Sequence, residues 1–154
     1  MKRVLLALTI VVLNVADAAA ANVEWRGSVC LTAVNPACNA IGWSLGDCGA
    51  LRFLPPKVGT NGSSTRFATF WGNNFAEIYT KSTGSLIGTT FKPVNGTGVG
   101  RNGFTFTSTM RLSSQTPTAP TAATDTIAIV GDVNNYDGTS SCNVSFRAAV
   151  TRQP

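Results

Sequence analysis

Four cysteines are the residues of this chain whose type and spacing most clearly predict chemistry: Cys30, Cys38, Cys48 and Cys142. An even number of cysteines behind an export signal is typical of a disulfide framework, because an oxidising compartment keeps such pairs closed. A metal site would need closely spaced cysteines with histidine support, but the spacing is C-x7-C-x9-C and the chain has no histidine. The sequence therefore predicts two structural disulfides, no metal site and no cofactor.

The pairing of these cysteines follows from the expected strands around them. Apolar residues alternate before Cys30 and after Cys48, which predicts two antiparallel strands joined by a loop. Such a hairpin centres near Asn39 and places Cys30 opposite Cys48, so Cys38 stays in the loop to reach Cys142. The alternative pairing joins Cys38 to Cys48 and Cys30 to Cys142. Either arrangement closes a loop of roughly a hundred residues, which is worth up to about 4–5 kcal/mol in the chain-entropy model.

Two tryptophans are candidate ligand-binding residues. Trp43 lies in the cysteine-containing loop between Gly42 and Ser44, and Trp71 borders Gly72. A flat aromatic face with a polar edge suits stacking on sugar rings. Trp25, in contrast, falls in phase with apolar neighbours, which favours a place in the core. The sequence thus leaves open a carbohydrate-binding module that uses exposed Trp43 and Trp71.

Catalytic residues are not evident, so we do not expect an enzyme. Without histidine, the usual base for a serine or cysteine nucleophile is missing. A glycosidase-type hydrolase with a carboxylate pair is a third and less favoured alternative. Six acidic residues follow the export signal: Glu24, Asp47, Glu77, Asp125, Asp132 and Asp137.

Two motifs that suggest ligands lack the context that those ligands need. The run 98–103 has the G-x-G-x-x-G pattern of dinucleotide sites, but a strand pattern follows it where a helix is required, so it predicts a glycine-rich hairpin. The run 132–138 is out of register with a calcium-binding loop, so it predicts a turn.

The first 21 residues have the composition of a bacterial-type signal peptide. Lys2 and Arg3 precede a ten-residue apolar run over 4–13, and small residues follow at the spacing of a cleavage site. The apolar run is too short to span a bilayer, so we expect no transmembrane anchor. The prediction is a cleaved signal peptide over 1–21 and a single domain over 22–154, located in the periplasm or outside the cell.

The charge after cleavage restricts the partners. Without Lys2, Arg3 and Asp17, ten of the twelve basic and six of the seven acidic residues remain, a net charge of +4. These charges are scattered and form no run, so nucleic acid is not expected as a partner. Outside the cytoplasm the expected partners are an anionic polysaccharide or another surface protein.

Period-two alternation dominates the rest of the chain, as in half-buried strands. The clearest cases are 104–112, where every second residue except Ser108 is apolar, and 142–150, where every second residue is apolar. The segment 113–124, rich in Ser, Thr and Pro, predicts an exposed linker. About seven or eight short strands with no long helix predict an all-β fold, an antiparallel β-sandwich or a Greek-key barrel. The function we expect is that of an exported, disulfide-stabilised, non-enzymatic binding or surface-structural module.

Overall fold

Eight antiparallel strands make up most of the regular structure in the computed structural model, which describes residues 22–72, 75–81, 94–100 and 103–154. The predicted signal peptide lies outside the described residues. The elements are β1 (Trp25–Val34), α1 (Pro36–Asn39), β2 (Cys48–Leu54), β3 (Thr65–Trp71), β4 (Phe75–Lys81), β5 (Val94–Val99), β6 (Thr105–Thr116), β7 (Thr126–Asn134), the short 3-10 helix η1 (Tyr136–Gly138) and β8 (Asn143–Arg152).

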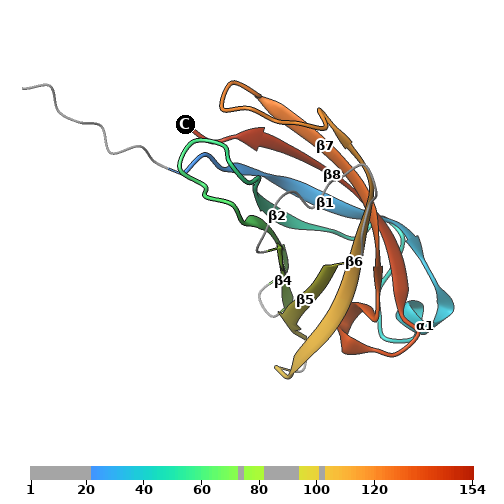
Figure 1. The fold of residues 1–154 in the computed structure, drawn as a ribbon. Coiled ribbons are helices and arrows are strands. Elements are labelled where there is room, and N and C mark those ends of the chain that lie inside the picture. Colours follow the sequence, from blue (N-terminus) through green and yellow to red (C-terminus); the bar gives the residue numbers. More distant parts are fainter. Residues whose placement is uncertain (1–21, 73–74, 82–93, 101–102) are drawn as a thin grey trace, which may run out of the picture.

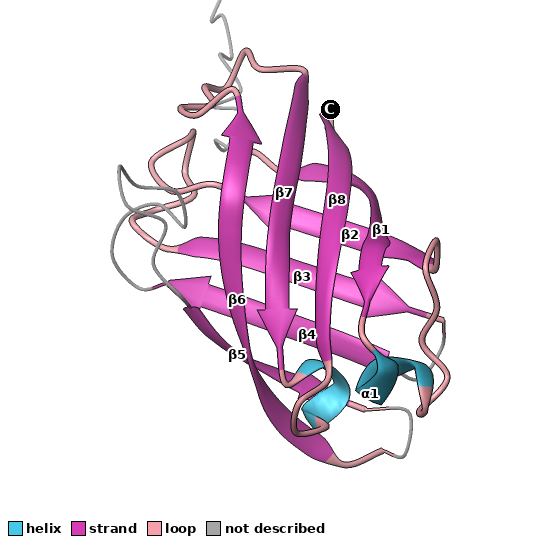
Figure 2. Ribbon diagram, turned by 90° about the vertical axis from the view of Figure 1, so that its right-hand side faces the viewer, coloured by secondary structure: helices cyan, strands magenta, loops and turns pink. Residues whose placement is uncertain are grey.

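The strands close into a barrel. Each strand pairs with the next one in the sequence, and β8 pairs with β1. In Figure 2, β6, β7 and β8 run across the near face, and β2, β3 and β4 cross behind them at a steep angle. The all-β fold with eight antiparallel strands confirms the coarser prediction. The connections are those of an up-and-down barrel, and not of a sandwich or a Greek key, because alternation indicates which side chains face inwards but not which strands pair.

The barrel interior is filled by the apolar side of this alternation. Along β8, for example, Val144, Phe146, Ala148 and Val150 are all buried, and Arg147 between them is exposed. Neighbouring strands contribute further aromatic and branched side chains to one continuous core. Burial of this apolar surface is the main term that stabilises the fold, at about 25 cal/mol per Å².

One end of the barrel is covered by the loops that contain α1 and η1, which lie together at the end opposite the C-terminus (Figure 1). Asn35 caps α1, because its Oδ1 accepts a hydrogen bond from the backbone N–H of Cys38 at 3.1 Å. The same side chain reaches the second loop, where Nδ2 donates to the carbonyl of Ser141 at 2.6 Å. Asn35 therefore ties the two covering loops to each other.

Two disulfides reinforce this end. Cys30 and Cys48 are direct neighbours across β1 and β2, and their sulfurs are bonded. Cys38 in α1 is bonded to Cys142, which precedes β8 and is 104 residues away in the sequence. The preferred pairing is thus confirmed, and the hairpin register that suggested it is the one observed.

Candidate functional site

The two candidate tryptophans meet at the covered end of the barrel. The ring centroids of Trp43 and Trp71 are 5.5 Å apart in an edge-to-face arrangement. Phe75 and Tyr136 complete the cluster, with centroids 5.0 Å and 4.9 Å from that of Trp43. We call these four residues the aromatic plug. They come from the β1–β2 loop, β3, β4 and η1, which the covering loops and Cys38–Cys142 bring together.

The aromatic plug is buried, which differs from the exposed platform expected from the sequence. Trp43 is 2% exposed and Trp71 is 6% exposed. The Trp43 indole N–H donates to Asp137 Oδ2 at 3.3 Å, so its polar edge is also engaged within the protein. The physical reason is that the loop around Trp43 folds back over the barrel mouth. Neither ring presents a face on which a sugar could stack.

Beneath the aromatic plug lies a group of polar side chains that face into the barrel, which we call the interior polar cluster: Thr69, Glu77, Tyr79 and Ser108. Thr69 and Glu77 are direct neighbours across β3 and β4. Tyr79 Oη and Ser108 Oγ are 2.8 Å apart. All four residues are buried, next to a core that consists mainly of apolar side chains.

Glu77 has the most unusual environment of this cluster. Burial is the main reason that the pKa of Glu77 is raised to about 8; hydrogen bonds with Ser108 and Tyr79 oppose the rise, and the charge of Asp137 adds to it. The carboxyl group is therefore neutral at pH 7. Burial also raises the pKa of the Tyr79 hydroxyl well above its ordinary value.

From its residue type alone, Glu77 is one of six acidic residues after the predicted signal peptide. The position of Glu77 in the strand pattern indicates its burial. Glu77 occupies every second position together with Phe75 and Tyr79, so its side chain points to the same side as two aromatic side chains. Asp137 is near enough to influence the Glu77 pKa, but Glu77 is 1% exposed beneath the aromatic plug. In the part of the chain that the structure describes, Glu77 is therefore covered and not exposed to a polysaccharide.

The two motifs that suggested ligands begin in strands: 98–99 end β5, and 132–134 end β7, before η1. Gly98 lies in β5, and the backbone N–H of Gly103 donates to the carbonyl of Gly100 at 2.9 Å, close to the start of β6. Asp132 Oδ1 accepts a hydrogen bond from the Ser145 hydroxyl at 2.7 Å. Among the residues that the structure describes, no group of three or more His, Cys, Asp or Glu side chains could hold a metal ion.

The outer wall of the barrel provides a second candidate site, which sequence reasoning did not find. A groove of about 210 Å³ crosses the outside of β2, β3 and β4, and we call it the arginine groove. It is lined by Arg52, Leu54, Arg66, Ala68, Phe70 and Ile78. These residues are outward neighbours in the sheet, since Arg52 pairs with Ala68 and Ala68 pairs with Ile78. Only the pairing of three strands brings them together.

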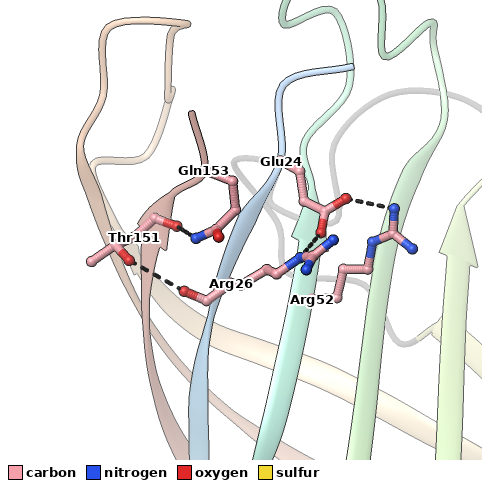
Figure 3. A network of polar contacts seen from close by, with 5 residues as sticks. All are labelled: Glu24, Arg26, Arg52, Thr151 and Gln153. Carbon is pink, nitrogen blue, oxygen red and sulfur yellow. Dashed lines mark hydrogen bonds and ion pairs between the residues drawn. The ribbon is translucent and has the colours of Figure 1, made fainter. Parts of the chain in front are cut away.

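Glu24 organises the edge of the arginine groove. Figure 3 shows its carboxylate between Arg26 and Arg52, with an ion pair to each. Burial alone would raise the pKa of Glu24, but hydrogen bonds and charge interactions with the two guanidinium groups outweigh it, so the net shift is downward. Glu24 thus compensates two like charges that face each other across β1 and β2.

Comparison with models of protein families, with curated proteins and with solved structures finds no match for this chain. Within the described ranges, no helix is long and apolar enough to cross a membrane.

Proposed function

We propose that this protein is an exported, non-enzymatic binding module, and that it contacts another surface protein through the arginine groove. The single observation that carries the proposal is the combination of two arginines with half-exposed apolar side chains in one groove on a closed barrel. Phe70 is 42% exposed and Ile78 is 48% exposed, although both lie in regular strands.

Export to the periplasm or the extracellular space is supported by the disulfides. The structure contains two disulfides and no free cysteine among the described residues, and such bridges persist in oxidising compartments. The apolar run that follows Lys2 and Arg3 agrees with secretion.

The composition of the arginine groove favours a protein as the partner. Arginine and aromatic residues are enriched at the centres of protein interfaces, whereas lysine is depleted, and this groove contains two arginines, one phenylalanine and no lysine. Planar guanidinium groups bind carboxylates through two parallel hydrogen bonds. An uncharged, uniformly hydrophilic partner would leave Phe70 and Ile78 without apolar contacts.

Charge complementarity defines the partner more closely. None of the six residues that line the arginine groove is acidic, and Arg66 forms no ion pair among the described residues. A segment that combines acidic side chains with apolar ones would neutralise Arg66 and cover Phe70 and Ile78. An anionic polysaccharide would satisfy the charge but not the apolar surface.

A titration followed by amide NMR shifts tests the proposal. Three probes are added to the purified protein: a synthetic peptide in which glutamate alternates with leucine and phenylalanine, the same peptide with lysine for glutamate, and an oligosaccharide of galacturonic acid. We expect the acidic peptide to shift amides of β2, β3 and β4, and the lysine peptide to shift none of them.

Substitutions then locate the contact. Arg66→Glu and Ile78→Ser should each weaken binding of the acidic peptide about tenfold, which corresponds to about 1.4 kcal/mol. The matched control is Arg111→Glu, an exposed arginine on β6, which should leave the affinity unchanged. Absence of shifts with all three probes at millimolar concentration, shifts with the oligosaccharide alone, or equal weakening by Arg111→Glu would contradict the proposal.

A further inference from the structure

Three buried polar atoms without a hydrogen-bond partner among the described residues belong to side chains that line one cavity. They are Thr69 Oγ1, Trp71 Nε1 and Glu77 Oε1. Thr69 and Trp71 both point inwards from β3, and Glu77 is the direct neighbour of Thr69 on β4. An unpaired polar group in a protein interior costs about 1–3 kcal/mol, so three of them around one cavity need an explanation.

The size of the cavity limits what it can hold. It lies between the aromatic plug and the interior polar cluster, and it measures about 10 Å³, which is about the smallest volume that accommodates one water molecule. Apart from Thr69 and Glu77, its lining consists of aromatic and aliphatic side chains, including Val29, Phe67 and Phe146. An organic ligand, even a small one, does not fit.

The hydrogen-bonding capacity of the three atoms selects among small occupants. An indole N–H can only donate, so the occupant has to accept a hydrogen bond from Trp71. The occupant also has to bond with an oxygen of Glu77 and with the hydroxyl of Thr69. A cation cannot accept from Trp71, and an anion would be buried among apolar side chains with no cationic group in the cavity lining. An apolar occupant would leave all three atoms unpaired.

We propose that this cavity is a binding site for one water molecule, which accepts a hydrogen bond from Trp71 Nε1–H and bonds with Glu77 Oε1 and Thr69 Oγ1. The water joins the aromatic plug to the interior polar cluster and gives the second oxygen of Glu77 its partner. The site is independent of the arginine groove, which lies on the outside of the barrel.

The three tryptophans provide an internal comparison for the test. Trp25 Nε1–H donates to the carbonyl of Thr124 at 2.9 Å, and Trp43 Nε1–H donates to Asp137. Trp71 is the tryptophan that lines the cavity, and its Nε1–H has no hydrogen-bond partner among the described residues. In an NMR experiment that detects transfer between water and protein protons, we expect a signal from a long-lived water at the Trp71 indole proton and none at the other two.

Substitutions complete the test. Trp71→Phe and Glu77→Leu each remove a partner, and each should lower by one the number of long-lived internal waters counted by magnetic relaxation dispersion. Glu77→Gln keeps an oxygen and should leave the number unchanged, which also covers the case in which Glu77→Leu fails to fold. Absence of the signal at Trp71 in the native protein, equal signals at all three indoles, or an unchanged water count in folded Trp71→Phe would overturn the proposal.

Discussion

Tyr79 Oη lies 2.8 Å from Ser108 Oγ although β5 runs between their strands. Gly96 makes this contact possible, because it pairs with Tyr79 on one side and with Ser108 on the other and places no side chain between them. A Cβ atom at position 96 would lie 2.4 Å from Cδ1 of the Tyr79 ring. The glycine therefore decides whether the interior polar cluster can form.

Substitution of Gly96 by valine should consequently destabilise the protein. The new side chain has to displace the Tyr79 ring, and overpacking of a filled core costs about 1–3 kcal/mol. Urea unfolding, followed by tryptophan fluorescence, measures the change. Thr97→Val is the matched control, because Thr97 lies on the same strand and is exposed. An equally stable Gly96→Val variant would show that the ring can move without loss.

Glu77 should make the free energy of unfolding fall as the pH rises. The unfolded chain loses the Glu77 proton near the ordinary value of 4.5, whereas the folded protein keeps it to about pH 8. Between these values the folded state binds one proton more than the unfolded state, so stability declines by about 1.4 kcal/mol per pH unit from this group. The contribution of Glu77 to the free energy of unfolding is fully present below pH 4.5 and is lost as the pH rises through 8.

Glu77→Gln removes this titration and keeps the shape of the side chain. The variant should gain stability relative to the native protein as the pH is raised from 5 to 8, as measured by urea unfolding at each pH. Tyr79 does not interfere with the comparison, because burial raises the pKa of its hydroxyl well above this pH range. Parallel pH profiles for the two proteins would contradict a buried, neutral Glu77.

The two disulfides should differ in how much each contributes to the free energy of unfolding. In the chain-entropy model, the bridge between Cys38 and Cys142, 104 residues apart, contributes about 5 kcal/mol, and the bridge between Cys30 and Cys48, 18 apart, contributes about 3 kcal/mol. Paired Cys→Ala variants compared by guanidinium unfolding test this order. Removal of Cys38–Cys142 should also change the tryptophan fluorescence of the folded protein, since this bridge fixes the loops that cover the aromatic plug.

The opposite result would be a larger loss of stability on removal of Cys30–Cys48 than on removal of Cys38–Cys142, with unchanged fluorescence in both variants. It would show that the covering loops keep their positions without Cys38–Cys142. The hydrogen bonds of Asn35 to Ser141 and of Trp43 to Asp137 would then link the two loops.

The sequence predicts the local features of this fold well. The disulfide pairing follows from hairpin register, because the strands on either side of the loop alternate clearly enough to place Cys30 opposite Cys48. The same alternation identifies the inward residues of β8. Trp25, expected in the core from its phase, is fully buried.

Non-local contacts account for what the sequence does not predict. The expected linker 113–124 begins later than its composition suggests, because β6 continues to Thr116 through an irregularity after Leu112. That shift turns Gln115 inwards, where its Nε2 donates to the carbonyl of Pro117 at 2.9 Å. The burial of Trp43 depends on a loop that folds over the barrel end, which no local pattern reveals.

Glu24→Gln is the prediction that tests the charges beside the arginine groove. Arg26 and Arg52 pair directly across β1 and β2, and Glu24 forms ion pairs with both. The side chains of Arg26 and Arg52 are 61% and 50% exposed, so solvent screens both ion pairs. We therefore expect Glu24→Gln to lower the free energy of unfolding by no more than about 1 kcal/mol at pH 7 and low salt. Urea unfolding at low and high salt measures this loss.

Salt and pH dependence distinguish this effect from a change in packing. The loss should shrink in 1 M salt, where the Debye length is about 3 Å. Because the pKa of Glu24 is lowered in the folded protein, its contribution is present above pH 4.5 and disappears as the pH falls through the folded value. Asp125→Asn is the control, since Asp125 is 88% exposed and lies 4.0 Å from Arg152, and it should have a smaller effect. A loss that persists at high salt and low pH would assign the role of Glu24 to packing rather than to charge.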